Sequence, residues 1–263
     1  IERKTNMPEW IECKISDIGT VVGGATPSTK KPENYENGTI AWITPKDLST
    51  FTGRYIQRGE RNITEIGLKS CSTQLLPKET VLFSSRAPIG YVAIAANEVC
   101  TNQGFKSVVP NENTDPLFLY YLLKYNKDKI EGMGSGTTFK EVSGNTMKNI
   151  VVSVPTDKKV QKRISSMLGS IDDKIEENER INNNLADLLQ TVYQEQFGDI
   201  ESAENQGILS DICTYSKEKV VISALNTSNY FSTENMLVDK GGATIASSLP
   251  TVSQTTACHK GDT

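Results

Sequence analysis

The sequence contains a single histidine among its 263 residues, His259, close to its C-terminal end. A Ser–His or metal–histidine site is therefore excluded from residues 1–155, and acid–base catalysis there would depend on carboxylates or lysines. Three catalytic signatures are also missing: the phosphate-binding G-x-x-x-x-G-K-[ST], the G-x-S-x-G nucleophile elbow and the [DN]-P-P-[YF] motif of amino-methyltransferases. The glycine-rich GMGSGTT lacks the spacing that the first of these needs. Together these absences argue against an independent enzyme.

Long apolar segments and paired cysteines are missing as well. No apolar run approaches about 18 residues, and no basic segment precedes an apolar one at the N-terminus, so neither a membrane span nor a signal peptide is predicted. The five cysteines are scattered and form no C-x-x-C pair, which favours unpaired thiols over a metal or redox site. We therefore expect a cytoplasmic protein that holds no metal.

The net charge of −4 argues weakly against a nucleic-acid partner. Residues 1–155 hold 18 Lys/Arg against 16 Asp/Glu, residues 156–198 hold 6 against 8, and residues 199–263 hold 4 against 8, which gives +2, −2 and −4. Only the first region is basic, and Arg54, Arg58 and Arg61 gather there in GRYIQRGERN. A local patch can attract a polyanion whatever the total charge. A solvated loop explains the same charges equally well.

The first 155 residues predict an α+β domain that is rich in strands. Short apolar runs bounded by turn residues indicate strands at TIAWIT (39–44), TVLF (80–83), YVAIA (91–95), FKSVVP (105–110) and NIVVSVP (149–155). One helix is predicted after Asp115, with Pro116 at its first position and Gly132 at its end.

Residues 158–197 predict a long helix that needs a partner. Proline is absent, glycine occurs once, and apolar residues follow heptad spacing. The helix would be about 60 Å long at 1.5 Å per residue, too long to pack wholly on the preceding domain. A coiled coil or an antiparallel helix pair is expected, and a helix folded against its own domain is the alternative. The residues assigned to the helix interface are Ile164, Met167, Ile171, Asn178, Ile181, Leu185, Leu188 and Val192.

Residues after 198 contain weak echoes of the first domain in the same order. ISDIGT (15–20) recurs as LSDICT (209–214), WITPKDL (42–48) as YFSTENML (230–237), and PKETVLF (77–83) as the terminal KGDT (260–263). Together the three matches suggest a second copy of the domain that stops where the first copy enters its 81–83 strand. We expect this copy to be incomplete.

Several stretches follow one another in a characteristic order: PEWIECKISDIG, WITPKDL, LFSSRAPIGYVAI followed by TNQGFKSVVP, GSGTTFKEVSGNTMKNIVVSVP, and the heptad helix ending in QEQF. In these stretches and their order the chain resembles the specificity (S) subunit of type I restriction-modification systems. That family has a target-recognition domain, a long helix, a second recognition domain and a second long helix. The resemblance covers nearly the whole chain, although a counterpart of Trp10 in the second half and a second long helix are missing.

The resemblance implies three parts: a first DNA target-recognition domain (1–155), a long spacer and dimerisation helix (156–198), and the start of an incomplete second recognition domain (199–263). It implies a non-catalytic subunit that directs adenine methylation and restriction to a split site on double-stranded DNA. Methylation (M) and restriction (R) subunits would be its partners, and S-adenosylmethionine and ATP would belong to them. Self-association through the long helix is a further expectation. The alternative is an assembly or scaffold module that uses the same helix without reading DNA sequence.

The candidate DNA contacts lie in turns that would present polar side chains to a groove. SSRAPIG interrupts a strand with two hydroxyls, an arginine and a proline, and arginine reads guanine while serine suits a phosphate or a base. For each residue a structural role remains open; Arg86, for example, could pair with an internal carboxylate. The candidate residues are Lys46, Arg54, Arg58, Ser84, Ser85, Arg86, Asn102, Gln103, Ser135, Thr137, Thr138 and Lys140.

Overall fold

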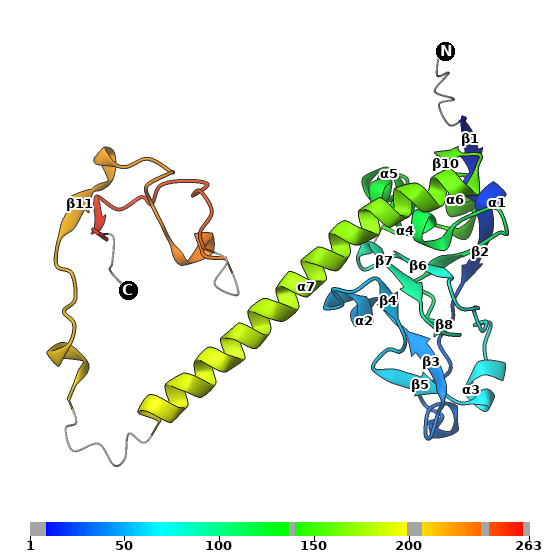
Figure 1. The fold of residues 1–263 in the computed structure, drawn as a ribbon, viewed down its shortest axis with the longest axis horizontal. Coiled ribbons are helices and arrows are strands. Elements are labelled where there is room, and N and C mark those ends of the chain that lie inside the picture. The colour runs from blue at the N-terminus through cyan, green and yellow to red at the C-terminus, as the bar shows by residue number, and fades with distance from the viewer. Residues whose placement is uncertain (1–8, 137–139, 199–206, 238–241, 260–263) are drawn as a thin grey trace, which may run out of the picture. The chain divides into compact units, whose positions relative to one another are not determined.

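The computed structural model describes residues 9–136, 140–198, 207–237 and 242–259. The chain divides into two compact units, residues 1–188 and residues 189–263. The first unit is a β-rich domain that continues into a long helix, and the second contains a small β region (Figure 1). The α+β class and this order of parts are as the sequence predicts. The assignment of recognition domains to 1–155 and 199–263 stays a prediction.

The main sheet of the first unit has five strands. Its order is β2–β9–β6–β7–β4, and neighbours are antiparallel except that β4 runs parallel to β7. These strands are β2 (Gly19–Gly23), β9 (Lys106–Pro110), β6 (Val81–Ser85), β7 (Ile89–Ala95) and β4 (Tyr55–Ile56). A smaller sheet of three strands places β3 (Ile40–Ile43) between β5 (Arg61–Ile63) and β8 (Cys100–Thr101). A separate pair joins β1 (Trp10–Lys14) to β10 (Val151–Pro155), with Trp10 opposite Pro155.

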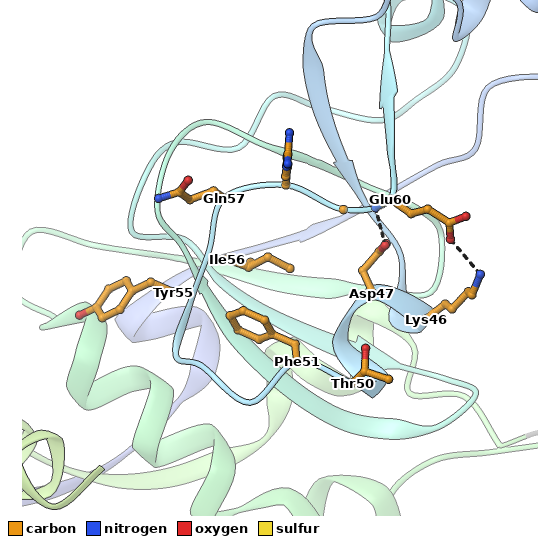
Figure 2. Close-up of a pocket in the computed structure, with 10 residues that line it drawn as sticks. Lys46, Asp47, Thr50, Phe51, Tyr55, Ile56, Gln57 and Glu60 are labelled. Carbon is orange, nitrogen blue, oxygen red and sulfur yellow. Dashed lines mark hydrogen bonds and ion pairs between the residues drawn. The ribbon is translucent and has the colours of Figure 1, made fainter. Parts of the chain in front are cut away.

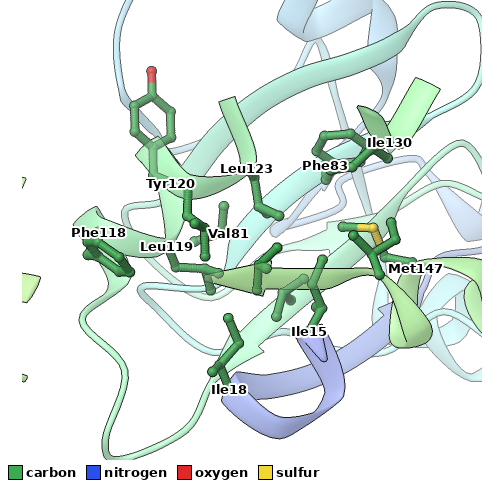
Figure 3. Close-up of a cluster of buried hydrophobic side chains, with 14 of the residues drawn as sticks. Ile15, Ile18, Val81, Phe83, Phe118, Leu119, Tyr120, Leu123, Ile130 and Met147 are labelled. Carbon is green, nitrogen blue, oxygen red and sulfur yellow. The ribbon is translucent and has the colours of Figure 1, made fainter. Parts of the chain in front are cut away.

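The central strands are buried on both faces, which explains why they are continuous apolar runs in the sequence. Side chains alternate between faces, so Val81 and Phe83 enter one core while Leu82 enters the other. The first core lies between the sheet and the helices, as Figure 3 shows for Phe83, Leu119 and Leu123 among others. A fully buried residue of this kind contributes about 1.5–3 kcal/mol to folding.

The predicted helix after Asp115 forms, but as two helices. The structure has α4 (Pro116–Tyr125) and α5 (Lys127–Gly132), with the break at Asn126. The Asn126 side chain donates a 2.8 Å hydrogen bond to the carbonyl oxygen of Leu122 and so helps to end the first helix. The other short helices of this unit are α1 (Ile15–Ile18), α2 (Pro45–Ser49), α3 (Glu65–Lys69), α6 (Gly144–Asn149) and the 3-10 turn η1 (Pro32–Asn34).

Helix α7 extends from Lys158 to Phe197, close to the predicted bounds. Its first three turns pack on the domain through Gln161, Ser165 and Gly169, which recur every four residues and are buried. Ile164 adds an apolar contact to the first core.

The second unit repeats local features of the first. In α1, Asp17 Oδ2 accepts the backbone N–H of Lys14 at 2.8 Å, and Asp211 does the same for Ile208 at 2.8 Å. The apolar side chains at matching positions differ in burial, because Ile15 is buried whereas Leu209 is largely exposed. After the end of α7, the described residues of this unit form η3 (Leu209–Asp211), β11 (Lys219–Val221), η4 (Ile222–Ala224), η5 (Thr233–Asn235) and β12 (Gln254–Thr256), of which β11 and β12 pair antiparallel.

Candidate nucleic-acid interface

Loops from distant parts of the sequence meet around Gly104. The Asn102 N–H donates to the carbonyl oxygen of Ile43 at 3.0 Å, and the Ser85 N–H donates to the Gly104 carbonyl at 2.7 Å. A Cβ on Gly104 would lie only 2.8 Å from Cγ of Pro45, so the turn presses directly on the start of α2. The segments that carry Lys46, Arg86 and Asn102–Gln103 therefore lie next to one another. We call these three segments (44–47, 84–88 and 102–104), together with the segment of residues 135–136 and 140–142 described next, the recognition loops, because they carry candidate DNA contacts predicted from the sequence.

A fourth segment joins these loops through Glu141. The backbones of Ser135 and Glu141 pair in both directions at 3.0 and 2.9 Å, and the Val142 N–H donates to the Ser85 carbonyl at 3.0 Å. Ser135 and Lys140 are exposed on this segment. Thr137 and Thr138 lie outside the described residues.

The two serines of the SSRAPIG turn are buried. Ser84 Oγ donates to the Pro88 carbonyl at 2.8 Å and accepts from the Tyr91 N–H at 2.8 Å, which ties the two sides of the turn together. Ser85 Oγ donates to the Gly104 carbonyl at 3.1 Å. Both hydroxyls brace the turn from inside the domain, and we leave both out of the proposed interface.

The same turn directs Arg86 toward a shared carboxylate. Arg86 Nη1 lies 3.5 Å from Glu141 Oε2, and Lys106 Nζ lies 3.3 Å from Glu141 Oε1. One carboxylate thus faces two cations, and the cluster keeps one net positive charge. The Arg86 and Glu141 side chains are each more than a third exposed, so solvent screens this pair. Lys106 was not among the site residues predicted from the sequence. The feature that could have indicated it is a charged side chain in the otherwise apolar strand FKSVVP.

A second polar region lies between α2 and the loop that joins β4 to β5, where Lys46 and Arg58 are balanced by Asp47 and Glu60 (Figure 2). A pocket of about 510 Å³ lies here, lined by Lys46, Phe51, Tyr55 and Arg58 among others. Lys46 Nζ forms an exposed ion pair with Glu60 at 2.8 Å, and this hydrogen bond raises the pKa of Lys46. Arg58 is exposed. Arg61 stacks over the Tyr35 ring, 5.1 Å from its centroid.

Asp47 fixes the shape of this pocket. Its Oδ2 accepts the backbone N–H of Thr44 at 2.7 Å and the Thr44 hydroxyl at 2.6 Å, which caps α2. Its Oδ1 accepts the Glu60 N–H at 2.6 Å and so holds the loop between β4 and β5 against the helix. A Cβ at Gly59 would lie 2.7 Å from the same carboxylate, so this close approach requires glycine.

Asn102 and Gln103 have different surroundings. Asn102 Oδ1 accepts the Gly104 N–H at 2.8 Å and closes the turn, whereas Gln103 is exposed and accepts a hydrogen bond from the Thr26 hydroxyl.

Arg54 lies apart from the recognition loops. Its side chain is only 10% exposed and contacts helix α7 instead, so we leave it out of the proposed interface as well.

The heptad stripe of α7 is largely exposed after the docked turns. Ile164 packs on the domain, whereas the described apolar side chains from Met167 to Phe197 are between 38% and 66% exposed. An exposed apolar stripe of this kind, interrupted at Asn178, is typical of a helix that packs against another helix. Among the described residues, no helix combines the length and the apolar character that crossing a membrane would need.

The geometry is therefore that of a β-rich domain with clustered polar loops and a long helix with an open apolar stripe. The chain belongs to the family of the type I restriction modification DNA specificity domain, whose model matches residues 7–186. It is 44% identical over 200 residues to the type I restriction enzyme MjaIX specificity subunit of Methanocaldococcus jannaschii, covering 75% of this chain and 46% of that protein. It is 29% identical over 167 residues to the EcoR124I/EcoR124II specificity subunit of Escherichia coli, covering 60% of this chain and 40% of that one.

Solved structures share the fold at low sequence identity. The HsdS subunit from Thermoanaerobacter tengcongensis has a TM-score of 0.51 at 18% identity, over 68% of this chain and 42% of that one. The S subunit from M. genitalium has a TM-score of 0.51 at 16% identity, over 92% of this chain and 63% of that one. The chain spans about half the length of the curated relatives it matches.

Proposed function

We propose that this chain is the non-catalytic DNA-recognition component of a type I restriction-modification complex, and that its recognition loops read one half of a split site. The single observation that carries the proposal is the meeting of four polar loops around Gly104 in a chain of this family. Cations beside these loops would contact phosphates and set the register, while side chains that enter a groove would read bases.

The proposed contacts are fewer than the sequence candidates, because Ser84, Ser85 and Arg54 face the interior or the helix. Thr137 and Thr138 are retained from the sequence, although they lie outside the described residues. The proposed contacts are Lys46, Arg58, Arg86, Asn102, Gln103, Ser135, Thr137, Thr138 and Lys140.

Partner subunits would supply the chemistry in the cytoplasm. Methylation subunits would bind S-adenosylmethionine, flip out the target adenine and dock on the exposed stripe of α7, and the restriction subunit would use ATP. The same stripe would let two copies of the chain associate, which would place two identical domains around a symmetric site.

Methylome sequencing tests this proposal. Cells that express the chain with a cognate methylation subunit are compared with cells that lack the chain. A split adenine-methylated motif that requires the chain is the expected result, and a palindromic motif would indicate self-pairing. A stable complex that methylates no new motif would contradict the proposal and favour an assembly module.

A further inference from the structure

Arg54 connects the β-rich domain to helix α7 through three acceptors. Its guanidinium donates to the Gly169 carbonyl at 3.2 Å and to Glu176 Oε1 at 3.3 Å, and it forms an ion pair with Asp173. These acceptors span two turns of one helix face. We call Arg54 with its three acceptors the helix clamp.

The surroundings of the clamp leave the arginine little freedom. Burial alone would lower the pKa of Arg54, but its hydrogen bonds with Asp173 and Tyr121 and the nearby carboxylates raise it instead. A Cβ on Gly169 would lie 3.1 Å from Arg54 Nη1 and 3.4 Å from Leu117, so a larger residue there would crowd the contact. From α4, the Tyr121 hydroxyl donates to Asp172 at 2.7 Å beside it.

A second attachment holds the beginning of the helix. Gln161 accepts the Asp115 N–H at 2.9 Å and donates to the Pro155 carbonyl at 3.0 Å, while the Ser165 hydroxyl donates to Asp115 at 2.8 Å. This attachment fixes where the helix starts. The clamp, one to three turns further along, fixes the direction in which it leaves the domain.

Arg54 itself directly precedes the residues that line the pocket beside α2, which include Tyr55 and Arg58. The Arg54 carbonyl accepts the Ile94 N–H at 2.8 Å at the start of β4, and Arg58 and Glu60 follow in the loop after β4. The short segment 54–60 therefore joins the contact with α7 to the lining of the pocket beside α2.

We propose that Arg54 is a positioning residue that fixes the angle between the recognition loops and α7, and thereby selects the number of base pairs between the two half-sites. This inference rests on the proposed function. Leu188 lies 12 residues beyond Glu176, a distance of about 18 Å along a helix. A swing of about 10° at the clamp would move Leu188 by about 3 Å, close to the 3.4 Å rise of one base pair. Loss of the clamp would thus widen the range of accepted distances between the half-sites without changing the bases read in each half-site.

The test replaces Arg54 by Met in the complete chain, assembled with a cognate methylation subunit. Arg180→Met is the matched control, because Arg180 pairs with Glu177 on an exposed face of the same helix and its removal subtracts the same charge. The expected methylome keeps both half-site sequences. Methylation at sites whose half-sites are one base pair further apart or closer together rises about fivefold or more over wild type. Arg54→Lys, which keeps the charge but loses the planar fork, should give an intermediate rise.

A second measurement does not depend on DNA. Spin labels introduced by unnatural amino acids at Asn97, in the turn after β7, and at Asn183 on α7 report the distance between domain and helix. The distribution should broaden in Arg54→Met and stay narrow in Arg180→Met. An unchanged spacer preference, or a uniform loss of methylation at every spacer length, would overturn the positioning role, as would an unchanged distance distribution. If wild type itself specifies no motif, the proposed function fails, and the label distances then still decide whether Arg54 holds the helix.

Discussion

At the scale of single residues, the Arg86 turn presents its charge at a controlled position. Ser84 and Ser85 brace the turn from inside, and Glu141 faces both Arg86 and Lys106. Two cations on one carboxylate leave a positive charge that a phosphate or a guanine edge can use. Because the Arg86–Glu141 pair is long and partly exposed, breaking it to bind DNA costs little.

Arg86→Ala should weaken binding of a cognate duplex by about 1–3 kcal/mol, roughly 5- to 150-fold in Kd, because a contact to a base edge or phosphate is lost. Fluorescence anisotropy measures this, and circular dichroism checks the fold. The control is Lys69→Ala, which removes an exposed cation from α3, outside the recognition loops. Equal Kd values for Arg86→Ala and wild type would exclude Arg86 from the interface.

Cys100 gives a prediction that depends on pH. Burial raises the pKa of its thiol to about 11 from 9.0, because the thiolate would lose its hydration inside the domain. At pH 9 about 1% of Cys100 is therefore thiolate, against about half for an unperturbed thiol of pKa 9. Iodoacetamide should modify the exposed Cys213 and Cys258 at pH 8–9 and leave Cys100 intact, as peptide mass spectrometry can follow. Rapid labelling of Cys100 in the folded chain would contradict its burial; urea-unfolded protein is the positive control.

At the scale of elements, α7 has two parts with different surroundings. Its first turns are part of the domain core through Gln161, Ser165 and Gly169, whereas the later heptad positions are exposed. Substitutions in the first turns should therefore change stability, and substitutions in the later part should change association.

Ile171→Asp with Leu185→Asp should abolish association with methylation subunits or with a second copy, because two uncompensated charges would be buried in the helix seam. Both side chains are more than half exposed in the chain itself, so its thermal unfolding should change little. Size-exclusion chromatography with light scattering measures the loss. Ser166→Asp with Asn183→Asp adds the same charge away from the seam and should leave the complex intact. A complex that survives the seam substitutions would show that partners bind elsewhere.

Asp115→Ala should lower the free energy of unfolding by about 1–2 kcal/mol, because Asp115 both caps α4 and anchors α7. Its Oδ1 accepts the Phe118 N–H at 2.9 Å and the Ser165 hydroxyl at 2.8 Å. Urea titration followed by circular dichroism gives the change. Asp115→Asn keeps an acceptor at this position and should lose less than half as much. If Asp115→Asn lowers the free energy of unfolding as much as Asp115→Ala, the stabilisation comes from the charge of Asp115 rather than from its hydrogen bonds.

At the scale of the whole molecule, a net charge of −4 has to be compatible with the proposed DNA binding. The proposed contacts include four cations, Lys46, Arg58, Arg86 and Lys140, in the part of the chain with a positive balance. Long-range attraction of the whole chain is weak, so binding should depend on local phosphate contacts.

Raising the salt concentration from 50 to 200 mM should therefore weaken duplex binding roughly 100-fold, as expected for about four neutralised phosphates. Anisotropy titrations at several salt concentrations give the slope. Substituting one of the four cations should reduce the slope of log K against log salt concentration by about one unit, whereas Lys69→Ala should leave that slope unchanged. A flat salt dependence would instead favour the assembly-module alternative.

The sequence by itself determined the order of parts. Apolar runs predicted β3, β6, β7, β9 and β10, and the heptads predicted α7 nearly to its ends. The strands β1, β2, β4, β5 and β8 were not predicted. The Asp115–Pro116 pair predicted where α4 begins, since a helix start needs local capping. These features depend on neighbours within a few residues, which the sequence displays directly.

The tertiary structure decided which polar side chains lie at the surface. Arg54 and Arg58 are four residues apart and look alike in the sequence, yet only the folded chain brings α7 against Arg54. Ser84 and Ser85 are buried because β7 and Gly104 lie across from them, and Lys106 meets Arg86 only through Glu141. Each of these contacts joins residues that are far apart along the chain or on opposite sides of a turn. Local sequence patterns specify secondary structure, whereas burial and pairing of a polar group depend on which distant segments pack beside it.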